Sequence, residues 1–474
     1  MGGTIGQLTL FYYLCIMIRS IKIGIRHIIW RMTALIIATM ILISCGEEQN
    51  NSVIIVVPTP EAPPTYTLIY LASGGDTLDE AIERSISNIC KSPLAENINL
   101  TANIKWTKGY TSAMSRGEGE VCRFAVSGGS RDIEMSEVGD NSYPLYEPEN
   151  IAEFIRWSTE VAPADNYILV LAGHGNGWHP EVGIEATRGT LRDTDLDRYV
   201  SLEELSEGIE LSGVRFKMIQ MISCLMNTME YVTDMANYAD YFTASSHVSV
   251  MLCTELQWLH MSLRSIKSRD EAEYIEAMKE YMSYVRMDIR LLELENEKVD
   301  FCITNCGAIA ALNEAIREFT DRLMMLYNEE ARLGEDSFRE IYGCSMSDVE
   351  AAISKAYYFM GAHLNDEEML NTEYLRMAFS YDLVDITRRA AGAISSEELK
   401  QCAQRVLECA RSARRIEYST SLEGIGEVFY GVTLTNSEQW VARGYDIAGY
   451  EDTLFDRTTG WSRLLKRNNI ELRY

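Results

Sequence analysis

The feature that most constrains the fold is an alternation, from residue 66 to about 245, between short continuous apolar runs and helical stretches. The clearest runs are YILVLA at 167–172 and FKMIQMI at 216–222. Strands that are apolar throughout are buried on both faces, which is typical of a parallel sheet with helices on each side. The sequence therefore predicts an α/β fold with a mostly parallel sheet flanked by helices. We expect strands at 66–71, 97–106, 121–126, 167–172, 216–222, 241–245 and 429–435.

Helical patterns separate these strands and dominate the chain beyond residue 260. The stretch at 201–211 opens with a capping box, because Ser201 is followed three positions later by Glu204. The length of 474 residues allows two or three domains or one large enzyme. We expect helices at 77–90, 151–161, 201–211 and 226–236, and then at 269–290, 308–332, 347–363 and 395–416.

The chain is acidic, with 43 Lys and Arg against 70 Asp and Glu and a net charge of -27. Nucleic acid is therefore disfavoured as the main partner, because phosphate backbones call for clustered basic side chains. A local basic site is still allowed. Hydrophobic residues make up 47% and charged residues 24%, which is ordinary globular usage and excludes wholesale disorder.

The N-terminus differs from the rest, because residues 1–44 contain four basic residues and no acidic one. An apolar run at 33–43 follows the basic residues, and Ser44-Cys45-Gly46 ends it. This order is typical of an export signal, and the run is too short for a comfortable membrane span. Leu42–Cys45 resembles the bacterial lipoprotein box, which implies cleavage before Cys45 and a lipid on its thiol. The alternative is a signal anchor that stays uncleaved.

We therefore assign 1–44 to a lipoprotein signal peptide and 45–65 to a lipid-anchored tether. Val53–Val57 within the tether could instead be a docked strand. The acidic residues after Cys45 resemble surface-export signals of Gram-negative lipoproteins. The expected location is thus outside the cytoplasm, anchored to a bacterial membrane, with the outer membrane and the cell surface as the candidates.

The eleven cysteines are scattered along the chain. Nine remain after Cys15 and Cys45 are set aside, and an odd number leaves at least one thiol outside any disulfide framework. Cys302 and Cys306 are four positions apart, and no CxxC pair has zinc-site spacing. Most of these thiols are expected to be small buried side chains.

Two potentially reactive side chains follow the two clearest strands. His174 lies in AGHGNGW after the first, and Cys224 lies in ISCLM after the second. Catalytic groups gather at the carboxyl ends of parallel strands. A nearby base makes a thiol nucleophilic, and a following helix would favour the thiolate further. Each residue alone has an ordinary structural explanation, as a buried thiol or a loop histidine, so the pair is the informative observation.

These segments resemble the clostripain family of cysteine peptidases, which belongs to the same clan as caspases, gingipains and legumains. ADNYILVLAGHGNGW at 164–178 resembles the family's histidine motif, and Cys224-Leu225-Met226 with Glu230 resembles its cysteine motif. The resemblance preserves order over about 66–465 and implies a caspase-like fold. Further matching segments are YTLIYLASGGDTL at 66–78, Ser201-x-x-Glu204-Leu205, Tyr238–Tyr241, Ala244-Ser245, Phe429–Thr435 and Thr459-Gly460-Trp461.

The resemblance implies that His174 is the general base and Cys224 the nucleophile. It also implies an oxyanion hole formed by the backbone N–H groups of Gly175 and Cys224. The substrate would be a peptide bond, cleaved through a thioester acyl-enzyme. His179 competes as the base, but its position after Trp178 does not match the motif.

The chain departs from the family pattern in the substrate pocket. Ile222 stands where the family usually has an Asp two residues before the nucleophile, and Ser246 with His247 stands where a further acid is common. An Asp–Arg pair supplies a discrimination that Ile cannot supply. We therefore expect a pocket, including Ile222 and Ser246, that does not require a basic side chain before the scissile bond.

The loop between the two motifs raises two further questions. Arg188, Arg192 and Arg198 are candidate self-processing points, as in other family members, and an ordinary exposed loop is the alternative. Four acids also have calcium-loop spacing, although Arg198 occupies the position that needs glycine. No cofactor is required, and calcium is the one candidate. The candidate calcium ligands are Asp193, Asp195, Asp197 and Glu204.

The sequence as a whole predicts an exported, lipid-anchored cysteine endopeptidase. We assign 66–306 to a caspase-like catalytic domain and 307–474 to a helical C-terminal region that closes on the core. The expected partners are protein or peptide substrates and, through Cys45, a membrane. The alternatives are a lipoprotein that binds peptides without efficient turnover, and an amidase or acyl-transfer enzyme with the same dyad.

Overall fold

The computed structural model describes most of the chain from residue 62 to residue 470. The expected signal peptide, Cys45, most of the tether and the candidate cleavage point Arg188 lie outside the described residues. Within the described part, no helix is both long and apolar enough to cross a membrane. The gaps are 76–77, 116, 118, 141, 179–188, 248–250, 293–299, 358, 360–379, 420–428, 435–436 and 439–447.

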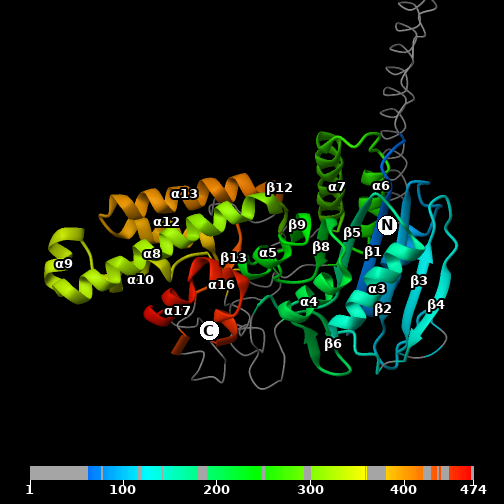
Figure 1. Ribbon diagram of the computed structural model, residues 1–474, viewed down its shortest axis with the longest axis horizontal. Coiled ribbons are helices and arrows are strands. Elements are labelled where there is room, and N and C mark those ends of the chain that lie inside the picture. Colours follow the sequence, from blue (N-terminus) through cyan, green and yellow to red (C-terminus); the bar gives the residue numbers. More distant parts are fainter. Residues whose placement is uncertain are drawn as a thin grey trace, which may run out of the picture. The chain divides into compact units, whose positions relative to one another are not determined.

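The core is a mixed sheet, for which nine strands are described, in the order β12-β10-β9-β8-β5-β1-β2-β3-β4 (Figure 1). Its five central strands are parallel, and the strands outside them are antiparallel to their neighbours. The predicted α/β class with a largely parallel core is therefore confirmed. The central strands are β9 (Ala239–Ala244), β8 (Phe216–Ile222), β5 (Asn166–Ala172), β1 (Tyr66–Ser73) and β2 (Ile98–Lys105); the outer ones are β12 (Arg414–Ser419), β10 (Asp300–Asn305), β3 (Val121–Val126) and β4 (Glu134–Gly139).

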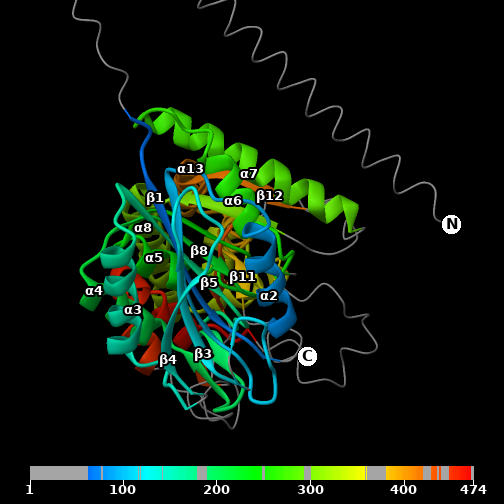
Figure 2. The same cartoon turned by 90° about the vertical axis from the view of Figure 1, so that its right-hand side faces the viewer.

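Helices cover both faces of this sheet, as the continuous apolar strands require (Figure 2). Successive side chains of a strand point to opposite faces. Leu68 and Tyr70 of β1 thus pack under one set of helices, while Ile69 and Leu71 pack under the other. The first set is α2 (Leu78–Ile89), α6 (Glu255–Leu263) and α7 (Glu271–Leu291); the second is α3 (Pro148–Val161), α4 (Leu202–Ser212), α5 (Met229–Met235) and α8 (Ile309–Leu333).

The C-terminal helices continue the second apolar layer. Residues 61–474 form one compact unit, because α8 packs on α5 as well as on α13 (Glu397–Ala413) and α16 (Leu454–Thr459). This region also supplies β12 to the main sheet, and residues on both sides of the predicted boundary at residue 306 belong to one compact unit. The remaining helices are α9 (Glu335–Tyr342), α10 (Met346–Ile353), α12 (Leu383–Ala393), α15 (Ala448–Glu451) and α17 (Ser462–Arg467).

Four expected elements differ in the structure. The helix expected over 347–363 ends at Ile353 as α10, and residues 354–357 are not helical. The helix expected over 395–416 ends at Ala413, and the chain turns into β12. The strand expected at 429–435 is reduced to β13 (Gly431–Thr433), which pairs with β11 (Ser380–Asp382) outside the main sheet. The helix expected from Met226 begins at Met229, because Leu225 has a left-handed φ of 61° and Thr228 bridges to Gly431. A positive φ interrupts a right-handed helix.

Candidate active site

Strand register brings the histidine and cysteine motifs together. In the parallel pair β5 and β8, Ala172 is opposite Ile222. His174 and Cys224 each follow two residues later, so both leave the sheet at the carboxyl ends of adjacent strands. Both side chains are partly exposed. The arrangement therefore supplies a thiol and an imidazole at the edge where parallel sheets collect their ligands.

The backbones of the two motifs are in contact as well. The Gly173 N–H donates to the carbonyl oxygen of Ile222 at 3.3 Å. A Cβ atom added to Gly175 would lie 2.6 Å from the carbonyl oxygen of Cys224 and 2.8 Å from the Cβ of Ser223. No side chain fits in that space without moving backbone, so the close approach of the two motifs depends on glycine at 175.

The turn that carries Cys224 is fixed by hydrogen bonds to the end of β9. The Leu225 N–H donates to the His247 carbonyl oxygen at 3.0 Å, and the Asn227 N–H donates to that of Ser245 at 2.9 Å. The helix α5 starts five residues after Cys224 and has seven residues. The expectation that a helix N-terminus directly favours the thiolate is therefore wrong, because dipole effects fade within the first turn.

The loop that follows His174 is held against a hairpin. Gly175 forms an antiparallel bridge with Thr190 of β6 (Thr190–Asp193), which pairs with β7 (Arg198–Val200). The hydroxyl groups of Thr190 and Ser223 lie 3.1 Å apart, so the hairpin also contacts the loop after β8. The backbone on both sides of the expected base His174 is therefore held in place, at Gly173 by Ile222 and at Gly175 by Thr190. The competing His179 lies outside the described residues.

The two expected pocket residues are nearly inaccessible. Ile222 is 4% exposed and belongs to the apolar layer under α6 and α7. Ser246 is 1% exposed; its hydroxyl accepts from the Asn227 side chain at 2.8 Å and donates to the Phe429 carbonyl at 3.3 Å. In this conformation Ser246 joins the cysteine loop to the segment before β13, and neither residue presents a charge near Cys224.

An aromatic group that the sequence did not reveal lies beside the thiol. Cys224 and Tyr357, both partly buried, pack against Leu225 and Phe359, which are fully buried. His247 joins this group, with Nε2 3.0 Å from the Tyr357 hydroxyl oxygen. Tyr357 and Phe359 are more than 130 residues from Cys224 in the chain, and only an aromatic pair after α10 could have drawn attention to them.

The C-terminal region supports both motifs through Tyr450. Its ring packs edge-to-face on Trp178 of the histidine motif, with centroids 4.7 Å apart. Its hydroxyl donates to the Glu230 carboxylate of the cysteine motif at 3.0 Å, and the Thr433 N–H donates to the same oxygen at 3.2 Å. Glu230 is 1% exposed, and burial raises the pKa of its carboxyl despite these donors.

The calcium candidates do not form one ligand set. Asp193 forms a buried ion pair with Lys105 and accepts from the backbone N–H groups of residues 195 and 196. Asp197 pairs with Arg192 at 2.6 Å, and Asp195 accepts from the Lys108 N–H at 2.9 Å. Glu204 is engaged by Arg198 and by the N-cap of α4. Among the described residues, no three His, Cys, Asp or Glu side chains gather as metal ligands.

Two of the three candidate cleavage points lie in the β6–β7 hairpin. Arg192 is in β6 and Arg198 in β7, and the Arg198 guanidinium also lies 3.7 Å from the ring centroid of Tyr146. A strand held in a hairpin cannot enter another active site without opening. The structure thus gives these two residues a packing role, and self-processing stays a prediction.

The parallel core, with a cysteine and a histidine at neighbouring strand ends, defines the caspase-like class of cysteine peptidases. A family model described as the clostripain family matches residues 130–466, and the chain belongs to this family of cysteine peptidases. No curated protein was found to match the sequence.

Solved structures of similar fold cover about 85% of this chain. An inactive zymogen of a C11 protease from Parabacteroides distasonis matches with a TM-score of 0.52 and 16% identity, over 85% of this chain and 99% of that one. A secreted C11 cysteine protease from Bacteroides thetaiotaomicron, bound to an irreversible peptide inhibitor, matches with a TM-score of 0.54 and 14% identity, over 84% and 99%. At these identities, the likeness concerns the fold.

Proposed function

We propose that the chain is an exported cysteine endopeptidase in which Cys224 is the nucleophile and His174 the general base. The observation that carries the proposal is the register of β5 and β8, which sets both side chains at one sheet edge. Family membership supports the peptidase activity. The partial exposure of both side chains supports access by a substrate.

The proposed reaction follows from this placement. The Cys224 sulfur attacks the peptide carbonyl carbon while its proton passes to the His174 imidazole. The N–H groups of Gly175 and Cys224 donate to the oxyanion that forms. The C–N bond then breaks, and the amine leaves with the proton from His174. Water, deprotonated by His174, hydrolyses the thioester and regenerates the thiol.

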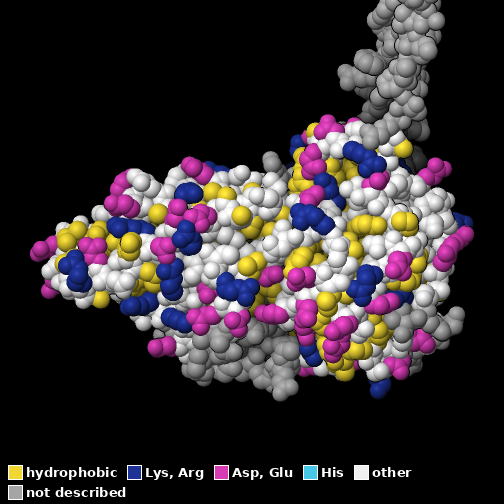
Figure 3. Space-filling model, in the orientation of Figure 1, with side chains coloured by type: hydrophobic (Ala, Val, Ile, Leu, Met, Phe, Trp, Pro, Cys, Tyr) yellow, Lys and Arg dark blue, Asp and Glu magenta, His cyan; other side chains and the backbone are white. Residues whose placement is uncertain are grey.

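The proposed substrates are proteins or peptides, and a basic residue before the scissile bond is not required. Ile222 brings no charge to the end of β8, and Ser246 uses its hydroxyl to join two loops. Nucleic acid is not among the proposed partners. The net charge is negative, and basic side chains lie among acidic ones on the face shown in Figure 3.

The proposed location is outside the cytoplasm, with a lipid on Cys45 as the membrane anchor. The charge and apolar pattern of 1–45 supports this, and a similar fold occurs in a secreted protease. Mass spectrometry of the membrane fraction tests it, because a mature chain that begins at a diacylated Cys45 is expected. A chain that keeps residues before Cys45 would contradict the lipid anchor.

Activity is tested with a peptide library and two matched cysteine variants. Wild type and Cys402→Ala are expected to cleave the library, because Cys402 lies on α13 away from the site. Cys224→Ala is expected to lose activity by at least about 10⁴-fold, as removal of a nucleophile does. Each protein is assayed with and without calcium, and equal rates are expected.

The alternative function is peptide binding without efficient turnover, which the altered pocket position Ile222 favours. It predicts that the same library is bound by wild type and Cys224→Ala and cleaved by neither. Cleavage that persists in Cys224→Ala would refute the assigned nucleophile.

A further inference from the structure

We propose that Tyr357, held from behind by the buried rings of His247 and Phe359, forms the wall of the subsite for the residue before the scissile bond, and that this wall selects an uncharged aromatic or large aliphatic side chain. The inference rests on the proposed function of Cys224. It adds the substrate class and assigns the specificity to Tyr357 and Phe359 of the C-terminal region, with His247 of the catalytic domain as their support.

The first observation is the position of the wall beside the thiol. Cys224 packs against Leu225 and Phe359, and Tyr357 packs against the same pair. Cys224 and Tyr357 stay partly exposed. The residue whose carbonyl carbon is attacked holds its side chain within reach of the nucleophile. Tyr357 is therefore the ring that a substrate side chain can reach beside Cys224, while His247 and Phe359 are buried behind it.

The second observation is the fixed geometry of the three rings. His247 is 2% exposed, and its ring lies edge-to-face on Phe359 with centroids 5.0 Å apart. Tyr357 and Phe359 are also edge-to-face at 5.5 Å, and the Tyr357 hydroxyl is 3.0 Å from His247 Nε2. Such contacts fix ring orientation, so the wall has a defined shape before a peptide arrives.

The third observation is how the wall is anchored. The Phe359 N–H donates to the Ser380 carbonyl at 2.9 Å, and the Asp382 N–H donates to that of Tyr357 at 2.7 Å. Both acceptor and donor belong to or flank β11, which pairs with β13. The Gly431 N–H of β13 in turn donates to Asn227, three residues after Cys224, at 2.9 Å. The wall and the nucleophile are therefore connected by backbone hydrogen bonds.

The fourth observation concerns charge. Among the residues that the structure describes, two acids contact the wall segment, and both are engaged with other groups. Asp385 accepts from the Tyr357 N–H at 2.9 Å and from the Arg389 side chain at 2.8 Å. Asp382 is 1% exposed and accepts from the N–H groups of Asp385 and Phe429. A guanidinium or ammonium placed against this wall would lose water and meet aromatic rings, which are weaker partners than a carboxylate.

The test compares full-length protein on peptides that differ only in the residue before the scissile bond. We expect kcat/KM for Phe, Tyr or Leu at this position to exceed that for Arg, Lys, Asp or Glu by at least about tenfold. A preference for any charged residue would overturn the inference and leave the proposed function intact. Absence of Cys224-dependent cleavage on every peptide would instead refute the proposed function.

Variants then assign the preference to the wall. Phe359→Ala is expected to lower kcat/KM for the Phe peptide by at least about tenfold while changing that for an Ala peptide less than threefold. Phe359→Leu keeps most of the packing and covers the case in which the alanine variant fails to fold. An equal loss on all peptides would overturn the inference.

Tyr357→Phe tests the contact with His247 while keeping the ring. We expect KM for the Phe peptide to rise several-fold with kcat nearly unchanged, because His247 and Phe359 then hold the ring less firmly. The matched control is Tyr284→Phe, since Tyr284 donates to Glu280 on α7 and should change neither constant. Equal kinetic constants for wild type and Tyr357→Phe would show that the contact between Tyr357 and His247 has no part in binding the substrate side chain.

Discussion

At the residue scale, Gly175 shows how much of the site depends on one missing side chain. Its close approach to Cys224 brings the histidine and cysteine motifs into backbone contact, at the point where a Cβ would meet the Cys224 carbonyl oxygen at 2.6 Å. The neighbouring Gly173 is similar, with the Ser73 carbonyl 2.9 Å from its added Cβ. The glycines that flank His174 are therefore explained by packing as well as by their motif.

Gly175→Ala is expected to reduce kcat/KM by about 10²-fold, because a shift of about 1 Å in a catalytic group has that cost. The fold should remain, since the clash is local. Gly392→Ala is the matched control: Gly392 lies in α12 with nothing within 4 Å of an added Cβ, so this change should leave activity unchanged. Equal activity of the two variants would mean that the contact does not position the motifs.

His260 gives the stability of the protein a pH dependence. It is 5% exposed, its Nε2 accepts from the Ala95 N–H at 2.9 Å, and burial lowers its pKa to about 4. In the unfolded chain the pKa is about 6.5, so the unfolded state binds more protons between these values. Its contribution is complete above about pH 6.5 and is lost as the pH falls through about 4.

We therefore expect wild type to lose about 3 kcal/mol more than His260→Gln between pH 7 and pH 4, by urea unfolding. Buried carboxyls act in the opposite sense, since the pKa values of Glu255 and Asp382 are raised to about 7. Both proteins contain these groups, so the difference isolates His260. Parallel curves for the two proteins would show that His260 is not held neutral by the fold.

At the element scale, the hairpin of β6 and β7 is stabilised by its own ion pairs. Asp193 and Lys105 are almost fully buried, and removal of one member of a buried pair leaves the other charge without compensation. The carboxylates at 195 and 197 face solvent or Arg192. The hairpin therefore has a structural explanation that involves no metal.

Asp193→Asn is expected to lower the free energy of unfolding by about 3 kcal/mol, because Lys105 would stay buried without its partner. Asp195→Asn should cost less than about 1 kcal/mol, since this side chain is exposed and makes one backbone contact. Thermal unfolding with calcium and with a chelator should give the same midpoint. If calcium raised the unfolding midpoint of wild type but of neither variant, the loop would be shown to bind calcium after all.

The elements also show what the sequence could predict. The central strands β5 and β8 were predictable because strands buried on both faces are continuously apolar, and the site residues follow from where those strands end. The strand β12 was not predictable, because its sequence RRIEYS continues the polar pattern of the preceding helix. Its partner β10 lies 110 or more residues earlier in the chain. The same separation conceals Tyr357 and Phe359, since no local pattern relates them to Cys224.

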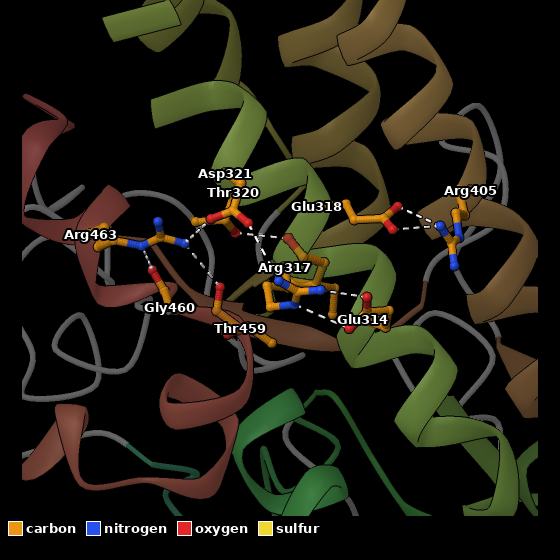
Figure 4. Close-up of polar contacts among 10 residues, drawn as sticks. Glu314, Arg317, Glu318, Thr320, Asp321, Arg405, Thr459, Gly460 and Arg463 are labelled. Atoms are coloured by element: carbon orange, nitrogen blue, oxygen red, sulfur yellow. Dashed lines mark hydrogen bonds and ion pairs between the residues drawn. The ribbon is translucent and has the colours of Figure 1, made fainter. Parts of the chain in front are cut away.

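At the scale of the whole molecule, buried contacts attach the C-terminal region to the core, and exposed ion pairs join helices within that region. The buried ones centre on Tyr450, which contacts both motifs. The exposed ones are shown in Figure 4: Arg463 of α17 pairs with Asp321 of α8 at 2.7 Å, and Arg405 of α13 pairs with Glu318. Exposed pairs contribute little, so we expect the buried contacts to dominate.

Tyr450→Phe is expected to cost about 1–3 kcal/mol, because the buried Glu230 loses a hydrogen-bond donor while the ring stays against Trp178. Arg463→Ala, as the control, should cost about 1 kcal/mol or less. Chemical unfolding of the two variants measures the difference. A larger cost for Arg463→Ala would mean that the ion pair between α17 and α8 contributes more to stability than the buried contact of Tyr450 with the cysteine motif.

The pairing of β12 with β10 has a consequence for the order in which the protein folds as it is synthesised. The sheet edge cannot close until residue 419 has been synthesised, and the contacts of Tyr450 need some thirty residues more. Contacts of such long sequence separation form late and slowly. A nascent or truncated chain that ends before residue 450 therefore lacks the contacts by which Tyr450 supports both motifs.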